Sequence, residues 1–200
     1  MAMATLIFIP GHWNTPACYD ALITALFAYG YNSATVLLPS VDCDAATYSL
    51  THELDALKAT LAALARIRRD VILILHPSLK YQRPSMKGYG EKKRAERSLK
   101  TGVVRMIFFM AFIGPEGFNA TKCGDAEVMR DFAKFELERG IVAVDRADSM
   151  NVFFQYLPAS EAQHWAARLL PQSVGVFWSA SNYTGWRNIP STYMLFSDDR

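Results

Sequence analysis

The chain has 200 residues, of which 51% are hydrophobic and 20% are charged, and its formal net charge at pH 7 is +2. These values exclude intrinsic disorder and fit one domain, because chains usually divide only beyond about 250–300 residues. The longest apolar run, residues 103–113, contains Arg105 and is too short to span a bilayer, so no membrane segment is expected. Three cysteines without metal-ligand spacing predict a reducing, cytoplasmic setting, and neither a metal ion nor a cofactor is expected; they are Cys18, Cys43 and Cys123.

The positive charge is concentrated in residues 80–100, which hold eight Lys or Arg against two Glu. This stretch is interpreted as a solvated helix face with its loops, because among its charges the only aromatic residues are Tyr81 and Tyr89. Neither nucleic acid nor a membrane surface is therefore expected as a partner.

In the first half of the chain, the apolar pattern predicts alternating strands and helices. Residues 5–9 form a continuous apolar run, which is typical of a buried parallel strand. Residues 17–29 show helical spacing of apolar side chains, and Gly30 is predicted to cap that helix. A short strand over 34–38, a long amphipathic helix over 47–67 and a third strand over 71–75 follow.

The second half is predicted to continue the alternation and to carry an insertion. A fourth strand is predicted over 103–113, helices over 125–139 and 160–169, and a last strand over 192–196. This alternation indicates an α/β protein with a mostly parallel open sheet flanked by helices. The aromatic-rich region 114–190 is predicted to be a helical lid above that sheet, within a single domain of residues 1–200.

Four separated segments resemble small α/β-hydrolase-fold proteins. The first is Pro10-Gly11-His12-Trp13-Asn14, which follows the first strand and resembles the turn that precedes the first helix in that family. The others are residues 71–76, residues 101–117 and residues 171–193. The resemblance covers nearly the whole chain and is strongest to fungal and bacterial proteins related to plant methylesterases and hydroxynitrile lyases.

The resemblance implies a Ser-His-Asp triad whose serine lies on a strand–turn–helix elbow, and an oxyanion hole made of backbone N–H groups. On this pattern Ser78 would be the nucleophile and Asp199 the acid. The substrate would be contacted by His12, Trp13, His76 and Leu79.

Two departures from the family pattern change what is expected of this site. The segment Leu75-His76-Pro77-Ser78-Leu79-Lys80 places proline where the nucleophile belongs, or surrounds Ser78 with bulkier residues than the glycines of such an elbow. The family continues past its acid to a final strand, the catalytic histidine and a closing helix, none of which follows Asp199. Of the four histidines only His76 is predicted near the elbow, and a serine without a base is a poor nucleophile.

Three functions remain open. The protein is a hydrolase or lyase acting on a small apolar ester, thioester or lactone through Ser78, a non-hydrolytic binder or cyclase-like catalyst with an apolar pocket, or an inactive, truncated relative. A disturbed reading frame over residues 76–88 is a further explanation of the altered elbow. Because the strand over 192–196 would lack an outer neighbour, a homodimer through this exposed sheet edge is also expected.

Overall fold

The computed structural model describes residues 3–43, 48–76, 90, 101–109, 111, 113, 131–179 and 185–196. In its first half the elements are β1 (Thr5–Ile9), the 3₁₀ helix η1 (Pro16–Tyr19), α1 (Asp20–Ala28), β2 (Ser33–Thr35), α2 (Leu50–Arg66), β3 (Val71–Leu75) and β4 (Val103–Phe109). In its second half they are β5 (Ala133–Glu136), η5 (Leu137–Arg139), β6 (Ile141–Val144), α5 (Arg146–Val152), α6 (Ala159–Ala166), β7 (Gln172–Ser173), α7 (Val174–Phe177), η6 (Gly185–Arg187) and β8 (Ser191–Met194).

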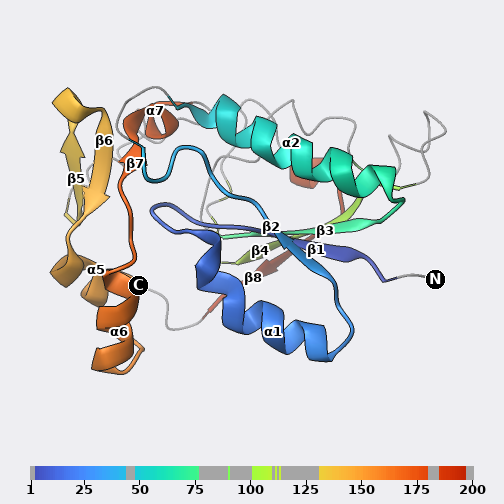
Figure 1. Ribbon diagram of the computed structural model, residues 1–200, viewed down its shortest axis with the longest axis horizontal. Coiled ribbons are helices and arrows are strands. Elements are labelled where there is room, and N and C mark those ends of the chain that lie inside the picture. Colours follow the sequence, from blue (N-terminus) through green and yellow to red (C-terminus); the bar gives the residue numbers. More distant parts are fainter. Residues whose placement is uncertain are drawn as a thin grey trace.

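A parallel sheet of five strands forms the centre of the molecule, in the order β2-β1-β3-β4-β8. The parallel pairing of all five strands confirms the predicted α/β class. All five residues of β1 are buried, as its continuous apolar run predicts. Helix α2 covers one face of the sheet and α1 the other (Figure 1). Helix α2 packs with its apolar stripe inward, and Leu54, Leu57 and Leu61 are buried there with the strands.

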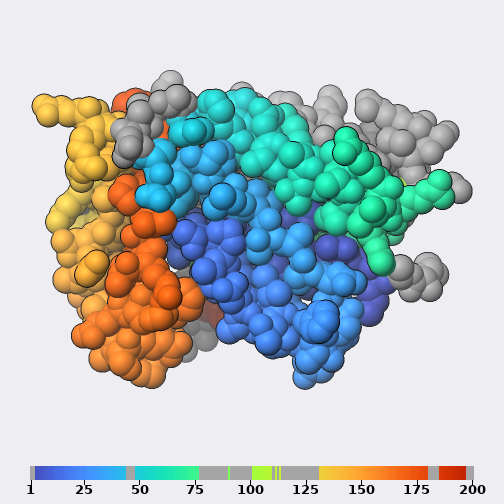
Figure 2. All heavy atoms as spheres, in the orientation of Figure 1, coloured from blue at the N-terminus to red at the C-terminus, as the bar shows by residue number. Residues whose placement is uncertain are grey.

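Helix α1 is more exposed than a helix of its apolar composition usually is. None of its residues is buried, and Leu22 and Phe27 are 40% and 71% exposed. Figure 2 shows the helix uncovered on this face of the molecule. The predicted cap is confirmed at Gly30, whose φ of 83° lies in the left-handed region that favours glycine. No described helix, α1 included, combines the length and apolar character needed to cross a bilayer.

Helices α5, α6 and α7 lie in the region 114–190, for which a helical lid is predicted, but the helix predicted over residues 125–139 is wrong in its described part. Strands β5, β6 and β7 form a second, antiparallel sheet. Residues 133–139, which were expected inside a helix, form β5 and η5, and the chain reverses at Gly140 with a φ of 66°. Burial of Ala133 and Val142 in one cluster with Trp13 outweighs the helix-forming composition of this segment. The helix predicted over 160–169 is confirmed as α6.

The second sheet and helices α5 and α6 lie beyond the end of the main sheet to which its parallel strands point (Figure 1). The loop after β1 enters this region, where Trp13 joins the cluster beneath the antiparallel sheet. Open α/β sheets bind their ligands outside the carboxyl ends of the strands. A ligand is therefore expected where the loop after β1 meets the antiparallel sheet.

Candidate functional site

Three of the residues selected from the sequence lie at the carboxyl ends of β1 and β3. His12 and Trp13 belong to the loop after β1, and His76 directly follows β3, the neighbour of β1. The His76 N–H donates to the Ile9 carbonyl at 3.4 Å. The His76 ring lies against Gly11, where an added Cβ would be 2.5 Å from the ring atom Nδ1. Glycine at position 11 is what lets the two strand ends approach so closely.

Trp13 joins the loop after β1 to the antiparallel sheet. Its N–H donates to Gln172 Oε1 at 3.1 Å, its indole Nε1–H donates to the Val142 carbonyl at 3.0 Å, and its own carbonyl accepts from Leu170 N–H at 2.9 Å. The residue is buried, with a φ of 62° in the left-handed region. Such a backbone costs about 1–3 kcal/mol and persists where surrounding contacts hold it. The three hydrogen bonds supply that constraint.

The His12 side chain is held between an aromatic ring and an amide. Its ring stacks on Phe177 with centroids 4.6 Å apart and an interplanar angle of 23°. Its Nδ1 lies 3.1 Å from Gln172 Oε1. The imidazole is partly buried. One ring face and one ring nitrogen therefore have fixed partners, which defines the orientation of the ring.

Gln172, for which the sequence predicts no role, connects this loop to α2. Its Nε2 donates to Ser40 Oγ at 2.9 Å and to Glu53 Oε1 at 3.1 Å, and the Ser40 hydroxyl in turn bonds to Glu53 Oε1. Gln172, Ser40 and Glu53 are all fully buried. Buried polar side chains of this kind are stable when their hydrogen bonds are made, and a connected set also fixes local geometry.

Burial changes the acid–base properties of two side chains near the loop. It lowers the pKa of His76 to about 4, so this imidazole is neutral and a weak base at neutral pH. It raises the pKa of the Cys18 thiol to about 12. Because the thiolate is the reactive form, Cys18 is not a candidate nucleophile.

The aromatic side chains around Trp13 form core more than an open surface. The centroid of the Trp13 ring lies 5.7 Å from that of the buried Phe177, 5.8 Å from that of Phe153 and 6.2 Å from that of Phe132. Phe153 is 37% exposed, so it forms part of the accessible rim. In the same aromatic-rich region, Trp178 is half exposed, and Tyr183 is outside the described residues.

Three selected residues, Ser78, Leu79 and Asp199, lie outside the described residues. The structure places the two remaining histidines as the sequence predicts. His52 is on α2, where it completes a capping box with Ser49, and His164 is exposed on α6. Within the described ranges no group of three or more His, Cys, Asp or Glu is placed to hold a metal ion.

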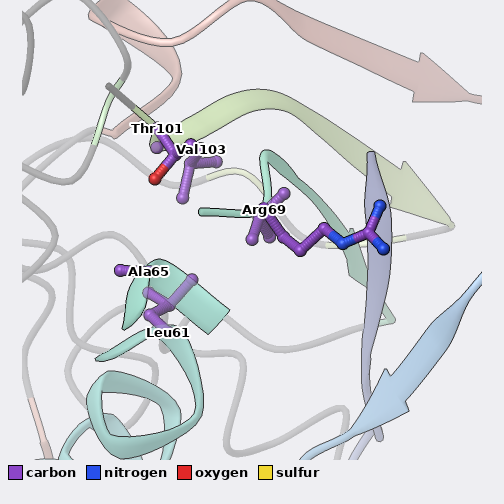
Figure 3. A pocket seen from close by; sticks show the side chains of 7 residues that line it. Leu61, Ala65, Arg69, Thr101 and Val103 are labelled. Carbon is purple, nitrogen blue, oxygen red and sulfur yellow. The ribbon is translucent and has the colours of Figure 1, made fainter. Parts of the chain in front are cut away.

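A hollow lies at the opposite end of the main sheet, between the last turns of α2 and the start of β4 (Figure 3). Leu61 and Ala65 line it from α2, and Thr101 and Val103 line it from the other side. Its volume of about 10 Å³ is room for roughly one water molecule. It is too small for an organic ligand and has no polar cluster, so the loop after β1 is the stronger candidate site.

Known proteins resemble the chain over nearly its whole length, although no protein-family profile matches it. The protein named alpha/beta hydrolase nvfD, from Aspergillus novofumigatus, is 24% identical over 207 residues, which cover 100% of this chain and 79% of that protein. An extracellular alpha/beta-hydrolase from Paenibacillus superposes with a TM-score of 0.70 at 16% identity, covering 96% of this chain and 76% of that one. Tomato methylketone synthase I, complexed with 2-tridecanone, gives a TM-score of 0.72 at 13% identity, with coverages of 99% and 81%.

Proposed function

Because the chain has the α/β-hydrolase fold, as its sequence predicts, we propose that it binds or acts on a small apolar carbonyl compound, such as an ester, thioester or lactone. The observation that carries the proposal is the grouping of His12, Trp13 and His76 at the carboxyl ends of β1 and β3, beside aromatic side chains. Apolar walls with a few fixed polar groups are typical of sites for small molecules. The 2-tridecanone bound by tomato methylketone synthase I is a compound of this kind.

A non-hydrolytic binder or cyclase-like catalyst fits this site better than a serine hydrolase. In a serine hydrolase of this family pattern, Ser78 would be the nucleophile, Asp199 the acid and Leu79 a substrate contact. Proline at position 77 and the missing elbow glycines oppose the strained turn that a nucleophilic serine needs. His76 is too weak a base at neutral pH to activate the serine. The triad is therefore proposed to be incomplete. Cys18 is a free thiol, which supports the proposed cytoplasmic setting.

Binding of methyl ketones of increasing chain length, measured by isothermal titration, tests the proposed function. Affinity is expected to rise with chain length and to fall by about tenfold in Phe153→Ala, which removes an exposed ring stacked on Trp13. Phe27→Ala is the matched control, because Phe27 is also an exposed phenylalanine but lies on α1. Equal affinities in both variants, or none in the wild type, would reject a site at this loop.

A fluorophosphonate probe is expected to leave Ser78 unlabelled, and hydrolysis of activated esters is expected to stay near the rate without protein. The physical reason is the crowded elbow together with the weak base, since loss of triad members costs several orders of magnitude. Intact-mass spectrometry after incubation with the probe measures the labelling, with Ser78→Ala as the control. Stoichiometric labelling that disappears in Ser78→Ala would instead establish a serine hydrolase.

A second copy of the chain is proposed to pair with β8, the strand at one edge of the main sheet. Within the described part, β8 is hydrogen-bonded only to β4, and all four of its residues are exposed. Leu195 and Phe196, which follow it, are 81% and 45% exposed. An exposed edge strand followed by apolar side chains is a template for pairing with another chain, and a twofold dimer would cover both edges at once.

The mass from light scattering is expected to rise with protein concentration toward that of two chains. Leu195→Lys should shift this equilibrium toward the monomer, because a charge at a strand edge opposes edge-to-edge pairing. Leu137→Lys is the matched control, since Leu137 is an exposed leucine next to the antiparallel sheet. A single-chain mass at every concentration tested would exclude the dimer.

A further inference from the structure

Three segments of the chain meet at the amino ends of the parallel strands, the end of the main sheet opposite the candidate site. The Thr5 N–H donates to the Asp70 carbonyl at 2.8 Å. The Leu6 N–H donates to the Asn32 carbonyl at 2.9 Å. These hydrogen bonds hold the start of β1 between the turn after α1 and the turn after α2, and both turns lie on the side of the N-terminus in Figure 1.

Large apolar side chains protrude from all three segments. At the end of α1, Phe27 and Tyr29 are 71% and 78% exposed. Ile67, which follows α2, is 64% exposed, and Met3, which precedes β1, is 42% exposed. Met3 also adjoins the turn after α1, because its sulfur lies 4.0 Å from a Cβ added at Gly30. Single exposed apolar residues are ordinary, whereas a group of them at one end of a molecule marks an interaction surface.

The charged side chains exposed beside these residues are arginines. Arg66 and Arg68 are exposed, and neither forms an ion pair with a described residue. Arg69 is half-buried and lines the small hollow at this end (Figure 3). Asp70 is half-buried too and accepts a hydrogen bond from the Gly102 N–H at 3.2 Å. The amino-end surface is therefore apolar with a positive charge, and its residues are Met3, Phe27, Tyr29, Arg66, Ile67 and Arg68.

Arg68 occupies a backbone position that favours glycine. Its φ is 53°, in the left-handed region. Its N–H donates to the Ala65 carbonyl at 3.1 Å. The N–H of Arg69 donates to the Leu64 carbonyl at 3.2 Å. This pair of hydrogen bonds ends a helix through one left-handed residue, which is usually glycine.

Helix α1 ends with the same pair of hydrogen bonds but has the favoured residue. Gly30 has a φ of 83°, and its N–H donates to the Phe27 carbonyl at 2.9 Å. The Tyr31 N–H donates to the Leu26 carbonyl at 3.2 Å. At the matching position of α2 an arginine is less stable than glycine would be, because its Cβ crowds the backbone. Residues that break a local rule in this way are commonly found where function requires their side chains.

We propose that the amino-end surface binds a lipid bilayer that contains anionic lipids. Phe27, Tyr29 and Ile67 enter the boundary between the head groups and the acyl chains. Arg66 and Arg68 meet the lipid phosphates, each adding an attraction that falls with salt. Side chains that protrude from three separate turns suit a bilayer, because lipids adapt to their shape. The sequence predicts no membrane surface as a partner, since only the fold brings these distant residues together.

This binding does not depend on the proposed function, because the loop after β1 lies at the other end of the sheet. Sedimentation with vesicles of phosphatidylcholine alone, or of equal parts phosphatidylcholine and phosphatidylglycerol, measures it. We expect the protein to bind the anionic vesicles, less so at high salt, and to bind the neutral ones much more weakly. Phe27→Ser should weaken binding about tenfold, because serine buries little apolar surface in the lipid. Leu137→Ser is the matched control, since Leu137 is an exposed leucine beside the antiparallel sheet.

Arg68→Gly separates the effect of the side chain on binding from its effect on the fold. Glycine adopts the φ of position 68 without strain, so the melting temperature should rise by about 2–4 °C. Binding to the anionic vesicles should nevertheless weaken about fivefold, because one positive charge is lost. Arg146→Gln, which removes an exposed arginine at the start of α5, should leave binding unchanged.

Equal binding to the two kinds of vesicle, or binding to neither, would overturn the proposal. It would also be overturned by an Arg68→Gly variant that binds the anionic vesicles as tightly as the wild type. Light scattering without vesicles gives a further check. A mass that is lower in Phe27→Ser than in the wild type would make this surface a contact between copies of the chain instead.

Discussion

Replacing Trp13 with alanine is expected to lower the free energy of unfolding by about 3–5 kcal/mol, the usual cost of truncating a large buried aromatic side chain. The ring packs with Phe153 and Phe177, and its Nε1–H bonds to the Val142 carbonyl at 3.0 Å. Loss of the side chain would therefore remove packing and leave a buried carbonyl without its donor. Urea unfolding monitored by circular dichroism measures the change.

Further variants separate the contributions within Trp13. Trp13→Phe keeps much of the packing but removes the indole N–H, and we expect it to cost about 1–3 kcal/mol for the unsatisfied carbonyl. Trp13→Gly should be more stable than Trp13→Ala by roughly 1 kcal/mol, because glycine adopts the φ of 62° without strain. Trp178→Ala is the control, since Trp178 is half exposed. If Trp13→Ala were no more destabilising than Trp178→Ala, Trp13 would not be the residue that holds the loop after β1 to the antiparallel sheet.

The main sheet was predictable because its signals are local. Continuous apolar runs bounded by Pro, Gly or charged residues specify buried parallel strands, and both β1 and β3 coincide with the predicted ranges. The stripe of leucines on α2 likewise specifies the face that it buries. The strand order has no such local signal, since apolar periodicity alone does not determine which strands are neighbours.

The second sheet and the connections of the site depend on contacts between distant segments. The sequence from Ala133 to Arg139 is rich in residues that favour helices, yet it forms a strand because β6 and the Trp13 cluster offer more burial. The residues next to Gln172 in the sequence give no indication that its side chain joins the loop after β1 to α2. Its partners His12 and Glu53 are 160 and 119 positions away, so only the folded chain brings them together.

The free energy of unfolding is expected to fall as the pH is lowered from about 6.5 to about 4, because of His76. Burial lowers the pKa of this imidazole from 6.5 to about 4 in the folded protein, and unfolding returns it to its ordinary value. Above pH 6.5 the His76 imidazole is neutral in both the folded and the unfolded protein, so it does not change the free energy of unfolding with pH. Between the two values only the unfolded state takes up a proton, which stabilises that state. Below about pH 4 the imidazole is protonated in both states, and the free energy of unfolding has lost the whole contribution of His76.

The size of the effect and its assignment to His76 are both measurable. A pKa difference of this size corresponds to at most about 3 kcal/mol, and the partial exposure of the residue makes that an upper bound. Carboxyl groups also titrate near pH 4, so the informative quantity is the difference between the wild type and His76→Gln at each pH. As the pH falls, the free energy of unfolding of the wild type should decrease relative to that of His76→Gln, since glutamine at position 76 takes up no proton. A pH-independent difference would mean that the His76 ring is solvated in the folded state and does not rest against Gly11.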